Sequence, residues 1–222
     1  FGWFGFNAGS ALTADHAAAV VFVNTLCAGA AGAIGWLLLE RIRDGHATSL
    51  GAASGMVAGL VAITPSCGAL TPLGALVMGL VAGVVCGLAV ALKYRWGYDD
   101  SLDVVGVHLI GGLVGTFGIG LLATAAAPSG VDGLLYGGGV DQLGKQLLGG
   151  FVVLGYAFVV SWVLAMIVHK AMGFRIDEEH EVSGIDSIVH AETAYDLHST
   201  AGARSGGVLS VRGDDRTMRG QR

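Results

Sequence analysis

The stretch DVVGVHLIGGLVGTFGIGLLATAAA, residues 103–127, decides the fold that we expect. After Asp103 it holds no acidic residue, no lysine and no arginine, and it exceeds the about 20 apolar residues with which a helix crosses a bilayer. One titratable side chain, His108, nevertheless lies a few residues inside it. Ionisable groups at such a depth usually face a bundle interior or a conduction pathway. We therefore interpret His108 as a pathway residue, the alternative being a histidine hydrogen-bonded to a neighbouring helix.

The composition agrees with a membrane protein. Hydrophobic residues make up 53% of the chain and charged residues 13%, whereas soluble domains carry about 25% charged residues. The 38 glycines are spread through the apolar stretches without a collagen-like period, which is typical of helices that pack closely in lipid. Cys27, Cys67 and Cys86 lie far apart in the sequence, and we interpret them as packing residues.

Five apolar stretches predict an all-α, polytopic transmembrane bundle. Four are long enough to span a membrane, and the second is short and ends at Thr64-Pro65. The opening FGWFGFNAGSAL, which leads to a polar turn at residues 13–15, reads as the end of a further span that begins upstream. The five stretches are 16–39, 50–64, 72–92, 103–127 and 147–171.

The basic residues of the loops alternate from one side to the other. Loops 40–49 and 93–101 carry arginine and lysine, whereas loops 65–71 and 128–140 carry neither. Positive residues mark the cytoplasmic side, so the last span is expected to exit there. We predict a transmembrane domain over residues 1–173 and a solvated cytoplasmic tail over 174–222, disordered in its distal part.

The opening stretch places aromatic and polar side chains near the outer mouth. Trp3 and Phe4 are explained by an interfacial aromatic belt. Phe6 and Ser10 are spaced i, i+4 and share a helix face, so a ring and a hydroxyl could hold a small cation there. The alternative is a packing phenylalanine beside a serine that ends the helix.

Asp103 lies five residues before His108, so the two side chains are not on one helix face. We interpret Asp103 as a carboxylate that stabilises the first turn of its helix, and Asp99 and Asp100 as loop or cap residues. The sequence holds no nucleophile–base spacing, phosphate-binding loop or metal-ligand cluster. We therefore expect neither an enzyme, nor a cofactor or metal, nor a nucleic-acid partner.

Four motifs resemble the ammonium transporter family (Amt/Mep/Rh), in particular its bacterial Amt branch. In order along the chain, the motifs are WFGFNAGSA (3–11), LGAASGMVAGLVAITPSCG (50–68), DVVGVHLIGGLVG (103–115) and FRIDEEHEVSGIDSIVHAETAY (174–195). The resemblance implies that the chain is a fragment covering the end of span six to span eleven of an eleven-span transporter.

The resemblance also implies roles for particular residues. Phe6 matches one of two stacked phenylalanines that gate the pore, and Ser10 matches the hydroxyl of the outer ammonium recruitment site. His108 matches one of twin pore histidines, and Val104 the hydrophobic inner end of the pore. Asp103 is in the family's aspartate position, where it could have a supporting structural role.

The tail matches the family's regulatory pattern with two changes. Ile185 and Ala191 replace a leucine and a glycine, and the second change puts a glycine-dependent turn in question. The second gating phenylalanine, the recruitment-site tryptophan and the other pore histidine belong to the first half of the family's fold. The tail residues that match are Gly184, Asp186, His190, Glu192 and Tyr195.

The resemblance implies a homotrimeric ammonium transporter of the cell inner (plasma) membrane. It would recruit NH4+ at the outer vestibule and conduct NH3 through a hydrophobic pore, with a PII-type nitrogen-signalling protein as a partner at the cytoplasmic face. An ammonium sensor that signals through its tail is the alternative. We expect the 222-residue chain by itself to show no uptake, because half of the pore wall is missing.

Overall fold

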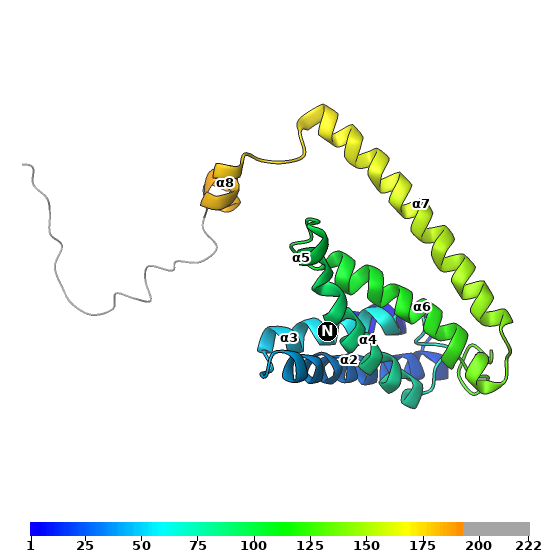
Figure 1. The fold of residues 1–222 in the computed structure, drawn as a ribbon. Helices are drawn as coiled ribbons and strands as arrows, with labels where there is room; N and C mark the ends of the chain where they lie inside the picture. Colours follow the sequence, from blue (N-terminus) through cyan, green and yellow to red (C-terminus); the bar gives the residue numbers. More distant parts are fainter. Residues whose placement is uncertain (193–222) are drawn as a thin grey trace, which may run out of the picture. The chain divides into compact units, whose positions relative to one another are not determined.

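The computed structural model describes residues 1–192, which are helical and contain no strand. This confirms the expected all-α class (Figure 1). Two units are described separately, Phe1–Val160 and a second unit that begins at Ser161, inside the last long helix. The elements are α1 Gly2–Gly9, α2 His16–Arg43, α3 Ser49–Ile63, α4 Pro72–Val90, α5 Leu92–Trp96, the π-helix η1 Val104–Leu109, α6 Ile110–Leu122, the 3-10 helix η2 Leu134–Tyr136, α7 Asp141–Met172, α8 Glu178–Ser183 and the π-helix η3 Asp186–His190.

Four helical segments are long and apolar enough to cross a membrane, and α3 is the short apolar helix, as the sequence predicts. Two boundaries differ from the prediction. The fourth segment ends at Leu122 and not at residue 127, because Ala123 is extended and the Thr124 N–H donates to the Ala69 carbonyl. The last helix begins at Asp141 and not at residue 147, and its polar first turn is joined by an ion pair between Asp141 and Lys145.

Local sequence explains where the long helices begin. The carboxylate of Asp15 accepts a hydrogen bond from the Ala18 N–H at the start of α2, at 3.1 Å. Thr48 and Thr71 cap α3 and α4 in the same way through their hydroxyls. Such caps satisfy backbone donors that have no partner within the helix. The Thr13 hydroxyl, followed by the Ala18 N–H, lowers the pKa of Asp15 below its ordinary value.

Glycine brings α2, α3 and α4 into backbone contact. A Cβ added to Gly59 of α3 would lie 2.1 Å from the Ala28 carbonyl oxygen of α2, and one added to Gly79 of α4 would lie 2.2 Å from the same atom. Gly83 of α4 faces the Gly32 carbonyl in the same manner, at 2.2 Å. The close packing that the glycine content predicts is therefore confirmed in this three-helix core.

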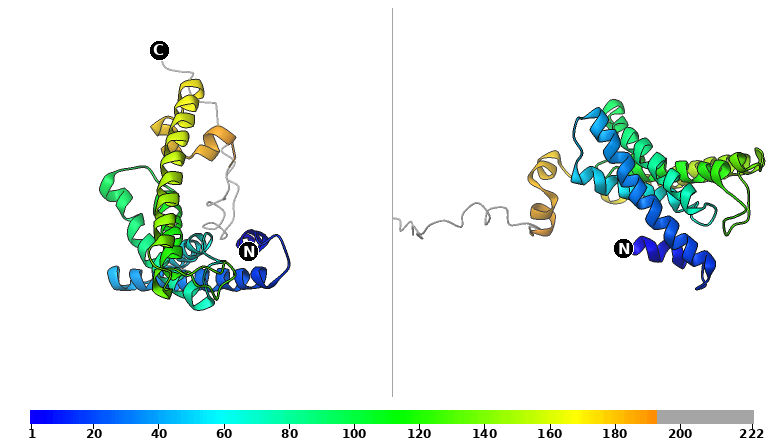
Figure 2. Two further views of the ribbon diagram at one scale, coloured as in Figure 1. Left: turned by 90° about the vertical axis from the view of Figure 1, so that its right-hand side faces the viewer. Right: turned by 90° about the horizontal axis from the view of Figure 1, so that it is seen from below.

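The loop between α3 and α4 is fastened from inside the bundle. Asn24 of α2 is fully buried, and its Nδ2 donates to the carbonyls of Cys67 and Leu70, at 2.8 and 2.7 Å. Buried backbone carbonyls need such partners. At the same end of α2, α1 folds back beside the N-terminal part of that helix (Figure 2). All three cysteines are free thiols, and Cys86 is fully buried among apolar side chains.

The described part of the second unit ends at Glu192. Beyond α7 it forms two short helices, α8 and η3, and an exposed ion pair joins Arg175 to Glu181 at 3.3 Å. Two residues of the tail have positive φ angles, Gly184 at 100° and Ala191 at 56°. The distal tail, with Tyr195, lies outside the described residues.

Candidate functional site

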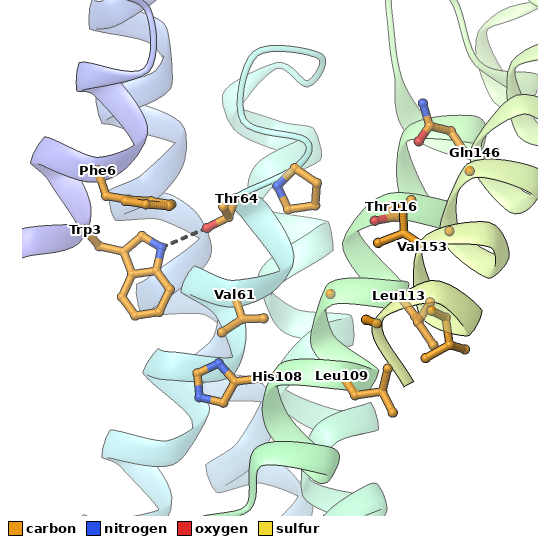
Figure 3. Close-up of a pocket in the computed structure, with 16 residues that line it drawn as sticks. Trp3, Phe6, Val61, Thr64, His108, Leu109, Leu113, Thr116, Gln146 and Val153 are labelled. Atoms are coloured by element: carbon orange, nitrogen blue, oxygen red, sulfur yellow. Dashed lines mark hydrogen bonds between the residues drawn. The ribbon is translucent and has the colours of Figure 1, made fainter. Parts of the chain in front are cut away.

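A cavity of about 650 Å³ opens in the first unit between α1, α3, the η1–α6 segment and α7 (Figure 3). Its wall is mostly apolar, and His108 is its one lining residue with a titratable side chain in the part of the chain that the structure describes. Small side chains from α6 and α7 leave the space open. The lining residues are Trp3, Phe6, Val61, Thr64, Pro65, His108, Leu109, Gly112, Leu113, Thr116, Gln146, Gly149, Gly150, Val153, Leu154 and Ala157.

His108 belongs to a π-helical turn that leads into α6. π-helical turns are rare and occur frequently at functional sites. Glycine lets this segment approach its neighbours, since a Cβ on Gly106 would lie 2.7 Å from Val90 and one on Gly111 3.3 Å from the Cys86 sulfur. The imidazole points to the side of the segment on which Trp3 lies (Figure 3). Within residues 1–192 no hydrogen bond holds its ring nitrogens, so both remain available to a molecule in the cavity.

A polar anchor fixes the start of the π-helical turn. The Asp100 carboxylate accepts hydrogen bonds from the backbone N–H groups of Val104 and Val105, at 2.7 and 2.9 Å. Asp103 has a left-handed backbone, with φ of 56°, and its carboxylate pairs with the Lys93 ammonium at 2.6 Å. The same ammonium donates to the Asp100 carbonyl at 3.0 Å. Three charged side chains thus hold the end of the segment that carries His108.

The anchor adds a partner for Asp103 that the sequence did not indicate. We expected its carboxylate to stabilise the first helical turn; it lies at the N-cap position of η1, makes no capping hydrogen bond, and pairs with Lys93. Asp100 supplies the cap, as expected for a loop or cap residue. The expectation that Asp103 and His108 face different ways is confirmed, because His108 lines the cavity and Asp103 does not.

The residues of α1 lie at one side of the cavity. The Phe6 ring is 64% exposed and lines the cavity. Ser10 follows the last turn of α1, and its hydroxyl donates to the Phe6 carbonyl at 2.8 Å. The serine is therefore a helix-end residue whose hydroxyl hydrogen is engaged, while its oxygen can still accept a hydrogen bond from a cation. Ser10 is not among the residues that line the cavity.

The structure adds contacts for the two aromatic residues that we interpreted as part of an interfacial belt. The Trp3 Nε1–H donates to the Thr64 Oγ1 at 2.8 Å, and the indole lines the cavity. Phe4 stacks on Phe22, with ring centroids 4.5 Å apart. Sequence reasoning missed Thr64 as a site residue, although its place before Pro65 marks the end of α3. Val104 is 52% exposed and is not a lining residue of this cavity.

The described residues gather no group of three or more histidine, cysteine, aspartate or glutamate side chains that could hold a metal ion. An aromatic face, an apolar wall and one imidazole favour the passage of a small hydrogen-bonding molecule over that of a hydrated ion.

Known proteins are similar to this chain in sequence and in fold. The family model described as the Ammonium Transporter Family matches residues 1–195. An ammonium transporter of Mycobacterium tuberculosis (strain ATCC 25618 / H37Rv) is 56% identical over 209 residues, which cover 91% of this chain and 44% of that protein. The crystal structure of Candida albicans Mep2 is similar with a TM-score of 0.73 and 32% identity, over 81% of this chain and 41% of that chain.

A structure described as a sensor Amt protein is similar with a TM-score of 0.75 and 29% identity, over 86% of this chain and 46% of that chain. The chain thus spans less than half of the length of these relatives. Its helices, including four that are long and apolar enough to cross a membrane, agree with a part of a larger multi-pass fold. The chain belongs to the ammonium transporter family.

Proposed function

We propose that the chain supplies the C-terminal half of a channel-like ammonium transporter. The observation that carries this proposal is the apolar cavity into which a lone imidazole, His108, points beside the aromatic side chains of α1. NH4+ would be attracted to the outer mouth by the Phe6 ring and the Ser10 oxygen. Since a bare cation cannot enter an apolar passage without a large desolvation penalty, the cavity would conduct NH3, with or without separate transfer of the proton.

His108 has a defined part in this proposal. A neutral imidazole can donate from one nitrogen and accept at the other, and both ring nitrogens are unengaged within residues 1–192. It could therefore pass ammonia along a dry wall and, together with the second histidine that the family resemblance implies, relay a proton. Val104 would line the inner end of the pore in the complete transporter, and Asp103 would support the segment through Lys93.

Further parts of the proposal concern the whole protein. We infer a homotrimer in the cell inner (plasma) membrane, contacting lipid, with a transmembrane domain over residues 1–173. Residues 174–222 would form a cytoplasmic tail that binds a PII-type signalling protein through the Gly184–Tyr195 pattern. The basic residues of loops 40–49 and 93–101 support this orientation, and the naming of the curated relatives as transporters supports a function other than catalysis.

Uptake of methylammonium into proteoliposomes tests the pore role of His108. The complete transporter should take up methylammonium, and His108→Ala should either stop this uptake or make the pore leak cations. His16→Ala is the matched control, because His16 is exposed at the start of α2 and does not line the cavity. Uptake by the His108 variant at the wild-type rate, without a leak, would refute the pore role.

The similarity to a sensor Amt protein favours a second candidate function, in which ammonium binding is signalled through the tail. The same vesicles distinguish the two functions. Net flux down an ammonium gradient supports the transporter, whereas saturable ammonium binding without flux supports the sensor.

The chain alone, without the first half, should show no uptake, and robust uptake would mean that copies of this half assemble into a complete pore.

A further inference from the structure

Three side-chain and backbone groups form a directed chain of hydrogen bonds in the cavity wall. The Trp3 Nε1–H donates to the Thr64 Oγ1 at 2.8 Å, and the Thr64 hydroxyl donates in turn to the Leu60 carbonyl at 2.8 Å. The threonine hydroxyl has one hydrogen, so the direction of each bond is fixed. The two side chains lie 61 positions apart in the sequence and are partly buried, and thus the pair is a tertiary contact that joins α1 to α3.

The Trp3–Thr64 hydrogen bond differs from the other contacts of α1 because it connects α1 to α3. Toward α2, the helix is held by a hydrogen bond from Asn7 to Thr25 at 3.1 Å and by the stacking of Phe4 on Phe22. Toward α3, the Trp3–Thr64 bond is the single hydrogen bond among the described residues. The indole also packs against the apolar cluster that includes Val61. The bond therefore fixes where the Trp3 ring stands.

The Trp3 ring lines the cavity through which a transported molecule would pass. Figure 3 shows the indole between Phe6 above and the level of Val61 and His108 below, and all of these residues line one cavity. Because the indole N–H and the threonine O–H are both engaged, this part of the wall offers a passing molecule no free donor, only ring and methyl surfaces and the remaining lone pair of Thr64 Oγ1. Without Thr64 Oγ1, the partly buried indole would keep an unpaired N–H, which disfavours the present position of the ring.

We propose that Thr64 is a positioning residue that holds the Trp3 indole in place in the cavity wall and thereby sets the discrimination between ammonium and methylammonium. This inference rests on the proposed transport function. A held ring keeps the passage narrow, whereas a released ring can turn and admit the added methyl group. A difference of one methyl group changes discrimination by about 10–200-fold at most, so we expect release of the ring to raise the methylammonium-to-ammonium flux ratio by about tenfold.

The test compares this flux ratio in proteoliposomes of the complete transporter. Thr64→Val removes the hydroxyl and keeps the shape, and it should raise the ratio by about tenfold. Thr64→Ser restores the acceptor and should return the ratio toward the wild-type value. The ratio is independent of how much protein inserts, so a lower yield of a variant does not imitate the effect. A wild-type ratio in Thr64→Val would overturn the inference.

Two further variants test whether both residues act through one bond. Trp3→Phe removes the donor, and Trp96→Phe is its control, because Trp96 is exposed on α5 and lies outside the cavity. In the double variant of Trp3→Phe with Thr64→Val, the ratio should be no higher than in the more affected single variant, since a shared interaction is lost only once. Multiplied effects would show that the residues act independently and would overturn the inference.

The outcomes separate this inference from the proposed function. If vesicles with the unaltered transporter carry no ammonium flux, the transport function itself fails. If they carry flux but Thr64→Val and Trp3→Phe leave the ratio unchanged, transport stands and the positioning role of Thr64 is refuted. Should Thr64→Val not fold, Trp3→Phe, which breaks the same bond from the other side, decides the question.

Discussion

Replacement of Gly59 by alanine tests whether backbone contact between helices stabilises the bundle. The added Cβ would lie 2.1 Å from the Ala28 carbonyl oxygen, 2.9 Å from the Ala28 carbonyl carbon and 3.2 Å from the Gly32 Cα, whereas an ordinary contact begins at 3.4 Å. To make room, α2 and α3 must separate by about 1.3 Å, the difference between 3.4 and 2.1 Å. The atoms in the way are backbone, so no side-chain rotation relieves the overlap.

The expected loss of stability follows from two opposing terms. Overpacking costs about 1–3 kcal/mol, and we expect the upper end, because α2 is also in contact with Gly79 and Gly83 of α4 and cannot move alone. Alanine returns about 1 kcal/mol through its helix propensity. The net loss is about 2 kcal/mol, which corresponds to a fall in Tm of about 4–8 °C for a domain of this size.

Thermal unfolding of the detergent-solubilised protein, followed by circular dichroism, measures this shift. Gly144→Ala is the matched control, since Gly144 lies in α7 and an added Cβ would have no neighbour within 4 Å. That control should keep or raise the Tm. If Gly59→Ala melts at the same temperature as Gly144→Ala, the close contact between α2 and α3 does not stabilise the fold, and the reasoning is wrong.

Two further predictions concern the anchor of η1 and the tail. Asp100→Ala removes the acceptor of the Val104 and Val105 N–H groups, so hydrogen exchange of these amides should speed up about fivefold, as the loss of a cap of about 1 kcal/mol implies; unchanged exchange would contradict the anchor. The Glu192 amide donates to the Asp186 carbonyl at 3.1 Å, and Ala191→Gly should slow its hydrogen exchange by about twofold to fivefold. A left-handed backbone costs an alanine about 1–2 kcal/mol, and the greater loss of chain entropy on ordering a glycine offsets part of the gain from removing that strain. Faster exchange in that variant would show that the alanine fits its turn without strain.

The sequence sufficed for features that depend on local pattern. Runs of apolar residues predicted the spanning helices, because a helix must match the thickness of the hydrocarbon core to avoid leaving polar backbone in lipid. The short second stretch became α3, the one apolar helix below spanning length in the described part of the chain. Glycine content predicted close helix packing, because a residue without a Cβ lets two helix backbones come into direct contact.

Helix ends were less predictable than helix positions. The apolar character of residues 123–127 suggested a continued helix, but the chain turns at Ala123 because Thr124 bonds to the loop between α3 and α4. The partner in that bond, Ala69, is remote in the sequence, and no local pattern could have indicated it. The polar first turn of α7 was missed for the opposite reason, because a search for apolar runs passes over charged helical residues.

Sequence alone therefore determined that this chain is a bundle of membrane-spanning helices with His108 placed inside one of them. Tertiary structure decided what surrounds that histidine. It paired Asp103 with Lys93, placed the Asp100 carboxylate at the first N–H groups of η1 and joined Trp3 to Thr64 in the cavity wall. The physical reason is that hydrophobicity and helix length can be read from consecutive residues of the sequence. Hydrogen bonds between distant segments form only after packing has brought their donors and acceptors to within about 3 Å of each other.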